Sequence, residues 1–269
     1  MTWRKFVKRA VAPVAMLSSS STRTPEVILC YHSVGLRAAP EVVAVDMLRR
    51  HLDLLQNNYH VVRVAELVAS IGDPANPLRP RVAVTFDDGY KGVLHHALPL
   101  LLERGLHAAA YVLPGLWGGT ASWPSGAPFA HRALWNVEDA QAWVGAGMSL
   151  GSHGLSHVDL SSAPLPVIKE EVAGSKRLLE EICGEVDGFC YPWGRASVGA
   201  MLEVEAAGYR YGLAAGYSRH HARENLFALG RIPVDHEDTV EDLQMKLRGG
   251  YDWLDGVGRL RSKVAWRSP

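Results

Sequence analysis

The chain has 269 residues, of which 48% are apolar and 21% charged, and its 28 basic residues balance its 28 acidic ones. This composition excludes a disordered or fibrous protein. Zero net charge gives no electrostatic reason to expect a nucleic acid or an acidic membrane as partner. The length suits one α/β barrel, so we predict a single domain over residues 26–269.

Residues 1–25 precede the first expected strand. Four basic side chains among the first nine residues are followed by an apolar stretch from Ala10 to Leu17 and a run of serines. Pro13 interrupts that stretch and no clean small-residue cleavage site follows, so the fit to a signal peptide is weak. We expect a basic, partly disordered leader, with a cytoplasmic location favoured over secretion. No other segment has the roughly 20 apolar residues of a transmembrane segment.

From residue 26 onward, short β-branched or apolar runs alternate with segments of helical period, which predicts βα units and a parallel sheet. The expected strands are 27–31, 61–62, 81–86, 108–113, 148–151, 188–191, 211–214 and 229–233. The expected helices are 47–57 with Asp46 as N-cap, 65–71, 92–104, 137–146, 166–182, 197–207 and 240–247. About seven such units favour an irregular (β/α) barrel with about seven parallel strands over an open sheet. Residues 74–80 and 115–129 are expected to be loops.

The strand at 81–86 ends at two aspartates, Asp87 and Asp88, followed by Gly89. Parallel α/β folds place their active sites at the carboxyl ends of strands, and a glycine permits a sharp turn there. Adjacent side chains point in alternate directions, so one carboxylate can reach a metal while the other faces a substrate water. A solvated Asp-Asp-Gly turn is the alternative interpretation.

Two histidines, His153 and His157, follow the next expected strand but one, within Gly-Ser-His-Gly-Leu-Ser-His. Their spacing lets two imidazoles converge on one ion. One carboxylate and two imidazoles suit Zn²⁺ or a similar divalent ion and leave coordination positions open for water and substrate. The sequence therefore predicts a catalytic metal site.

The segment 85–90, Thr-Phe-Asp-Asp-Gly-Tyr, together with Ser152 and the two histidines, resembles the polysaccharide deacetylases of carbohydrate esterase family 4. The resemblance extends from Leu29 to about Val234. It implies a distorted (β/α) barrel that removes N-acetyl groups from an amino-sugar polysaccharide or oligosaccharide with the help of one divalent ion, zinc being the expected one.

The resemblance also implies roles for individual residues. Asp87 would be the general base, and Asp88, His153 and His157 would bind the metal. A third family motif is matched by residues 189–194, Phe-Cys-Tyr-Pro-Trp-Gly. In that turn a backbone N–H, from Tyr191 or Trp193, is expected to hold the oxyanion.

The third motif departs from the family at Cys190, where many members place an arginine that orients the catalytic aspartate. Arg231 could supply the missing charge, because an opposite charge would keep Asp87 ionised and fixed in direction. Trp193 is also a candidate for stacking on a sugar face. Trp117, Trp123 and Trp135 fit sugar stacking and core packing equally, and none of these three is assigned to the site.

Most family members carry a general-acid histidine late in the chain, in a Leu-His-Asp context that is missing here. His236 is the late candidate near a strand end. The branch that includes poly-N-acetylglucosamine deacetylases is circularly permuted and takes this histidine from an N-terminal Tyr-His motif. Residues 29–34, Leu-Cys-Tyr-His-Ser-Val, match that motif, so His32 is favoured as the acid over His236.

Two other functions remain open from the sequence. Relatives of this barrel hydrolyse non-carbohydrate amides, and a fold does not separate such substrates. A catalytically silent carbohydrate-binding domain is the other alternative, although the intact carboxylates and histidines make it the weaker one. The sequence gives no indication of oligomeric state.

Overall fold

The computed structural model describes residues 26–72, 80–123 and 132–252, except for 218, 220 and 222. The expected leader at 1–25, most of the loop at 74–80 and the second half of the loop at 115–129 lie outside the described residues. Within the described residues, no helix combines the length and the apolar character needed to cross a membrane.

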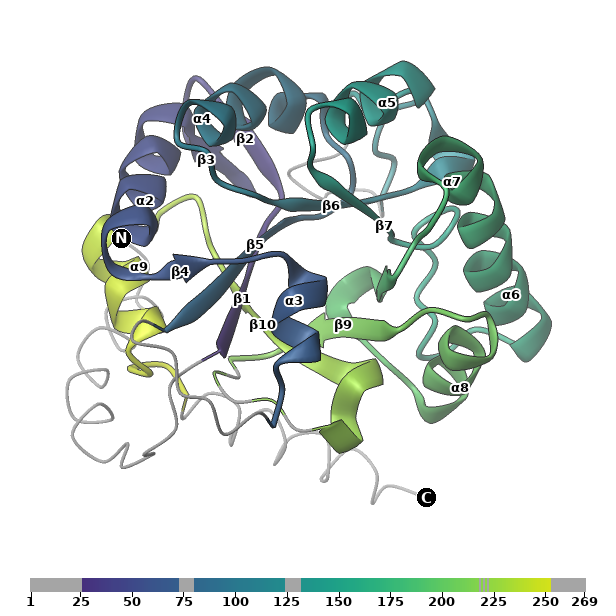
Figure 1. Cartoon of the computed structure of the whole chain (residues 1–269). Helices are drawn as coiled ribbons and strands as arrows, with labels where there is room; N and C mark the ends of the chain where they lie inside the picture. Colours follow the sequence, from purple (N-terminus) through teal and green to yellow (C-terminus); the bar gives the residue numbers. More distant parts are fainter. Residues whose placement is uncertain are drawn as a thin grey trace.

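Seven parallel strands close into a barrel (Figure 1). Around the barrel they are β1 (Glu26–Tyr31), β10 (Leu229–Pro233), β9 (Tyr211–Ala215), β8 (Gly188–Cys190), β7 (Ser149–Ser152), β6 (Ala109–Val112) and β5 (Arg81–Phe86), and β5 pairs again with β1. A short strand, β4 (His60–Val61), also pairs with β5, and β2 (Ser33–Gly35) pairs with β3 (Val42–Ala44) outside the barrel. The predicted barrel of about seven parallel strands is confirmed.

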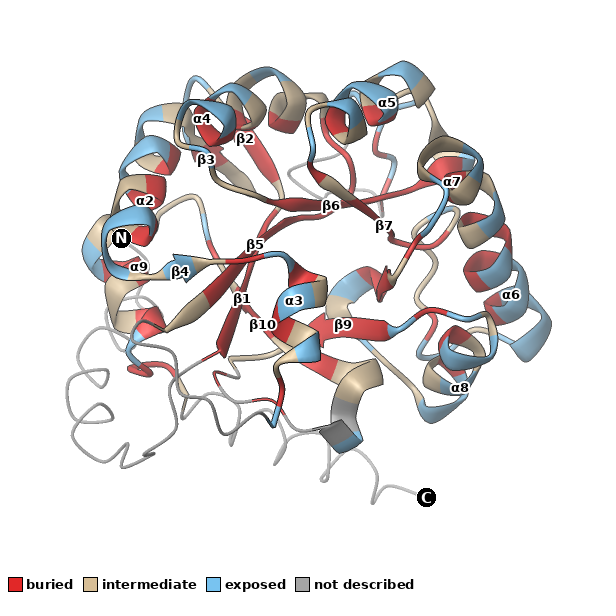
Figure 2. Cartoon of the chain, in the orientation of Figure 1, coloured by how far each residue is buried: buried red, intermediate tan, exposed pale blue. Residues whose placement is uncertain are grey.

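Helices surround the barrel (Figure 1). They are α2 (Val45–Asn58), α3 (Val64–Ala69), α4 (Leu98–Glu103), α5 (Val137–Gly145), α6 (Leu165–Lys169), α7 (Ser175–Cys183), α8 (Val198–Ala206) and α9 (Val240–Leu247). In the described residues, two π-helical turns, η1 (Val93–Ala97) and η3 (Glu170–Gly174), and three 3₁₀ turns, η2 (Pro114–Leu116), η4 (Pro192–Gly194) and η5 (Arg223–Ala228), complete the elements. Figure 2 shows the barrel strands mostly buried and the helices exposed on their outer sides.

The helices expected from the sequence are present, with three differences. The expected N-cap Asp46 is wrong: Ala44 precedes α2 without a side-chain cap, and Asp46 lies in the first turn. There its negative charge still interacts favourably with the helix dipole. The expected continuous helix at 166–182 is divided into α6, the π turn η3 and α7. The helix at 92–104 likewise contains a π turn, η1.

Alternate residues of each strand face the inside of the barrel, as the two-residue period of a strand requires. On β1, Ile28 packs in an inner cluster, whereas Val27 and Leu29 pack in the outer cluster between barrel and helices. Leu67 of α3 belongs to the inner cluster and covers the end of the barrel where the strands begin. The opposite end is therefore left for a site.

Two tyrosines fill the inside of the barrel. Tyr111 and Tyr211 are buried, and their hydroxyl oxygens lie 3.1 Å apart. The strands beside them carry glycine at the contact points: a Cβ at Gly151 would lie 2.4 Å from the Tyr111 ring, and one at Gly188 would lie 2.5 Å from the Tyr211 ring. Packing inside the barrel thus requires these glycines.

We expect Gly188→Ala to lower the free energy of unfolding by about 1–3 kcal/mol, because the added methyl group overpacks the barrel against Tyr211. Gly145→Ala is the matched control, since a Cβ there meets nothing within 4 Å and Gly145 lies in α5. Its stability should be unchanged or raised, because alanine favours helix more than glycine does. The measurement is the urea denaturation midpoint, and equal midpoints for both variants would contradict this packing.

Candidate active site

A cavity of about 230 Å³ lies at the carboxyl ends of the strands. The structure brings seven of the eight predicted site residues to its wall, namely His32, Asp87, Asp88, His153, His157, Trp193 and Arg231. They come from, or directly follow, β1, β5, β7, β8 and β10. Segments about 200 residues apart in the sequence therefore meet in one place.

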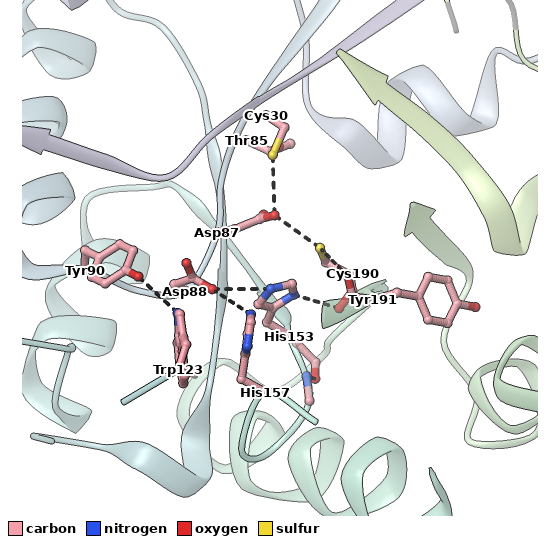
Figure 3. A network of polar contacts seen from close by, with 12 residues as sticks. Cys30, Thr85, Asp87, Asp88, Tyr90, Trp123, His153, His157, Cys190 and Tyr191 are labelled. Carbon is pink, nitrogen blue, oxygen red and sulfur yellow. Dashed lines mark hydrogen bonds and ion pairs between the residues drawn. The ribbon is translucent and has the colours of Figure 1, made fainter. Parts of the chain in front are cut away.

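Asp88, His153 and His157 converge on one point (Figure 3). The Oδ1 atom of Asp88 lies 3.4 Å from Nε2 of each histidine, and all three side chains are buried. His153 Nδ1 lies 2.8 Å from the carbonyl oxygen of Cys190, to which it donates, so that the Nε2 lone pair is left facing Asp88. Asp88 Oδ1 has no hydrogen-bond partner among the described residues. One carboxylate oxygen and two imidazole nitrogens that meet at one point fit a divalent cation.

His157 contacts two tryptophans. The Trp123 ring stacks on it with centroids 4.0 Å apart and planes 14° apart, and the Trp193 ring centroid lies 4.9 Å away. The indole N–H of Trp123 donates to the Tyr90 hydroxyl at 3.2 Å, which fixes the stacked ring (Figure 3). Packing against both tryptophans therefore restrains the direction of the second histidine.

Asp87 forms a buried two-point ion pair with Arg231. The guanidinium Nη1 and Nη2 lie 2.7 and 2.6 Å from the two carboxylate oxygens, and both side chains are at most 4% exposed. Burial alone would raise the pKa of Asp87, but the charge and hydrogen bonds of Arg231 outweigh it and hold that pKa well below its usual range. Asp87 is therefore ionised at neutral pH.

The cation beside Asp87 comes from Arg231 of β10, while position 190 holds a cysteine. Arg231 also lies 3.0 Å from the Cys190 sulfur and 3.1 Å from the Thr85 hydroxyl oxygen. Two thiols contact the same carboxylate oxygen of Asp87, Cys30 at 3.4 Å and Cys190 at 3.5 Å (Figure 3). The structure places Arg231 where the sequence-based hypothesis requires it, while its effect on turnover stays a prediction.

His32 and His236 lie in different surroundings. His32 directly follows β1 and lines the cavity, where its ring nitrogen belongs to a group with Glu41 and Asp88 whose atoms all lie within 4.8 Å of one another. His236 instead pairs with Asp235 and does not line the cavity. Of the two candidate acids, only His32 is near Asp87 and Asp88.

Tyr191 is the predicted site residue that the structure leaves outside the cavity. Its ring points away from the histidines (Figure 3), and its hydroxyl donates to the Phe227 carbonyl at 2.9 Å. Its backbone N–H donates to the Leu213 carbonyl at 3.0 Å, as pairing of β8 with β9 requires. The expected oxyanion role of Tyr191 is therefore corrected, because both of its donors are occupied. In the described part of the chain, no backbone carbonyl accepts a hydrogen bond from the backbone N–H of Trp193.

Backbone strain is concentrated at this cavity. The non-glycine residues with positive φ in the described part of the chain are Glu41 (61°), Asp88 (72°), His157 (65°) and Trp193 (62°). All four line the cavity. Such a conformation costs about 1–3 kcal/mol per residue and persists only where the surroundings enforce it. The fold therefore holds these side chains in fixed directions.

Among the other cavity residues, Cys30, Glu41 and Trp123 were not assigned to the site from the sequence. Cys30 had a signal, because it lies two residues before His32 and so shares its face of the strand. Trp123 fitted stacking and core packing equally. Glu41 belongs to a loop without any motif, and burial raises the pKa of its carboxyl group.

Comparison with known proteins follows the same motifs. The family model for polysaccharide deacetylase matches residues 75–212, just over half of the chain. YxkH of Bacillus subtilis (strain 168), which its name gives as a candidate polysaccharide deacetylase, is 24% identical over 208 residues, 77% of this chain and 70% of that protein.

Two solved structures are similar over most of the barrel. The Streptococcus pyogenes deacetylase PplD, in complex with acetate, and IcaB from Ammonifex degensii each have a TM-score of 0.72 and 22% identity, and each covers 84% of this chain. The match spans 99% and 97% of those chains. At this identity the likeness shows a shared fold.

The matched family model includes the strand ends that carry both aspartates and both histidines. A deacetylase of this kind is a hydrolase whose substrate is an acetylated carbohydrate. From the match over half of its length, the chain belongs to the polysaccharide deacetylase family.

Proposed function

We propose that the protein is a metal-dependent hydrolase that removes N-acetyl groups from an amino-sugar polysaccharide or oligosaccharide. The observation that carries the proposal is the meeting of the buried Asp88, His153 and His157 ligand set with an ionised Asp87 in one cavity. The similar PplD structure is described in complex with acetate, the product that such a reaction would release.

Asp88, His153 and His157 would hold the divalent ion, for which we propose Zn²⁺. Bound there, such an ion would polarise the acetyl carbonyl and lower the pKa of a bound water. Asp88 and His153 follow the ends of β5 and β7, His157 lies in the loop after β7, and the Cys190 carbonyl fixes the tautomer of His153.

Asp87 would accept the proton of the attacking water. The depressed pKa makes Asp87 a weak base. It would therefore accept a proton only from a water whose own pKa has been lowered, and it would release that proton readily. Arg231 keeps this carboxylate ionised and holds it in one orientation. The backbone N–H of Trp193 would donate to the oxyanion, which forms on the former carbonyl oxygen of the acetyl group.

His32 would protonate the departing amine. It lines the same cavity as Asp87 and lies beside the Glu41 carboxyl group. Trp193 has 38% of its surface exposed at the cavity wall and would stack on a sugar face.

The zinc-loaded protein should release acetate from an oligomer of N-acetylglucosamine, and removal of the ion by a chelator should abolish this release. The measurement is acetate produced per mole of protein, together with metal content. Metal binding without acetate release would favour another amide as substrate. A protein that neither binds metal nor releases acetate would be a carbohydrate-binding domain.

His32→Ala should lower kcat by about 10²- to 10⁴-fold, the usual contribution of one proton-transfer group, while zinc content stays unchanged. His236→Ala is the matched control and should keep the rate of the unmodified protein, because His236 lies outside the cavity. The reverse pattern would assign the acid to His236.

Arg231→Met should destabilise the protein by about 3–5 kcal/mol, because Asp87 becomes an unpaired buried carboxylate. The double variant Asp87→Leu/Arg231→Met should recover most of that loss, as measured by urea denaturation. A double variant as unstable as the single one would show that the guanidinium acts through packing alone.

The single variant Arg231→Met also tests how the rate depends on pH. With Arg231 present, the depressed pKa of Asp87 keeps the base ionised at neutral pH. The ion pair stabilises the folded protein, and this contribution is lost only as the pH falls through the depressed pKa. Without the cation, burial dominates and raises the pKa. The acid limb of kcat/KM in Arg231→Met should therefore move to higher pH. An unmoved acid limb would separate Arg231 from the ionisation of the base.

A further inference from the structure

The loop between the two metal-site histidines is tied to one buried carboxylate. The backbone N–H groups of Leu155 and Ser156 donate to Glu171 Oε2 at 2.7 and 3.0 Å, and the Ser156 hydroxyl donates to Glu171 Oε1. Glu171 is only 6% exposed, whereas the side chain of its neighbour Glu170 is 71% exposed. The two adjacent glutamates are thus in opposite environments.

Glu171 lies in the π turn η3, between α6 and α7. A π turn places one more residue in a turn than an α-helix does, and such turns are common at functional sites. The loop lies close against it: a Cβ at Gly154 would be 2.9 Å from Glu171 Oε2, and Gly154 has φ of 82°. The positive φ and this close approach both favour glycine at position 154.

In the described part of the chain, the Glu171 carboxylate oxygens accept hydrogen bonds from this loop alone. Among the described residues, no lysine, arginine or histidine forms an ion pair with it. A buried carboxylate without a cation must be stabilised by hydrogen bonds, and here all three donors come from Leu155 and Ser156. Glu171 therefore has a stable environment only when the loop is in this conformation, and the loop is fixed in return.

The conformation that is fixed matters for His157. Its φ of 65° is unfavourable for a residue with a side chain and would relax in an unrestrained loop. In the restrained loop its Nε2 lies 3.4 Å from Asp88 Oδ1. Restraint of the two preceding residues is therefore a condition for the ligand set to be in place before an ion arrives.

We infer that Glu171 is a positioning residue that presets the loop of His153 and His157 and thereby raises the affinity of the site for its divalent ion. The inference rests on the proposed metal site. Glu171 does not itself touch the ion or the substrate. It acts on the cost of ordering the loop, which in its absence would be subtracted from the binding free energy of the ion.

The test compares Glu171→Gln with Glu170→Gln, two equal changes of charge at adjacent positions. Zn²⁺ affinity of the otherwise intact chain is measured by competition with a chromophoric chelator. Glu171→Gln should bind Zn²⁺ about 10- to 100-fold more weakly, the usual effect of losing a partner that orients metal ligands. Glu170→Gln should bind as the unmodified protein does. Ser156→Ala, which removes one of the three hydrogen bonds, should show a smaller loss.

The outcomes separate the inference from the function on which it rests. If the unmodified protein binds no divalent ion, the proposed metal site is wrong. If it binds Zn²⁺ and Glu171→Gln binds equally tightly, the site stands and the inference is overturned. Circular dichroism of the metal-free variants shows whether they fold. Should Glu171→Gln not fold, Ser156→Ala decides, and unchanged Zn²⁺ affinity in that variant overturns the inference.

Discussion

The ion pair between Arg231 and Asp87 is the interaction on which the rest of the site depends. It joins β10 to the end of β5 across β1, which pairs with both strands. A buried pair is tolerated only when its geometry is good and further polar partners are present. Here the Thr85 hydroxyl and the Cys190 thiol provide such partners. The ion pair that orients the proposed base therefore forms only when the barrel has closed with its strands in the correct register.

A second constraint is that contacts within the protein fix the polar groups of the site. The Cys190 carbonyl orients His153, two tryptophans hold His157, and Glu171 restrains the loop between them. Each restraint comes from a different element of the barrel. Electrostatic stabilisation in enzymes relies on groups that need no rearrangement during the reaction. The strained backbone at the cavity is the energetic cost of that order.

Much of this arrangement could be predicted from the sequence, because its strongest signals are local. Asp87 and Asp88 follow a buried strand, His153 and His157 follow another, and parallel strands bring such ends together. The direction of the Tyr191 side chain could not be predicted, since it depends on the pairing of β8 with β9. Neither could Glu41, because its loop reaches the cavity only through tertiary packing, nor the π turns that interrupt two periodic segments.

The adjacency of the first and last barrel strands has a consequence for the assembly of the protein. β1 lies between β5 and β10, so the wall that carries His32 is completed only when β10 has been added. During synthesis, a chain that ends before Arg231 would carry both aspartates and both histidines but expose the free edge of β1 and an unpaired Asp87. An incomplete chain would therefore lack a complete site, and its unpaired strand edge would be prone to association with other chains.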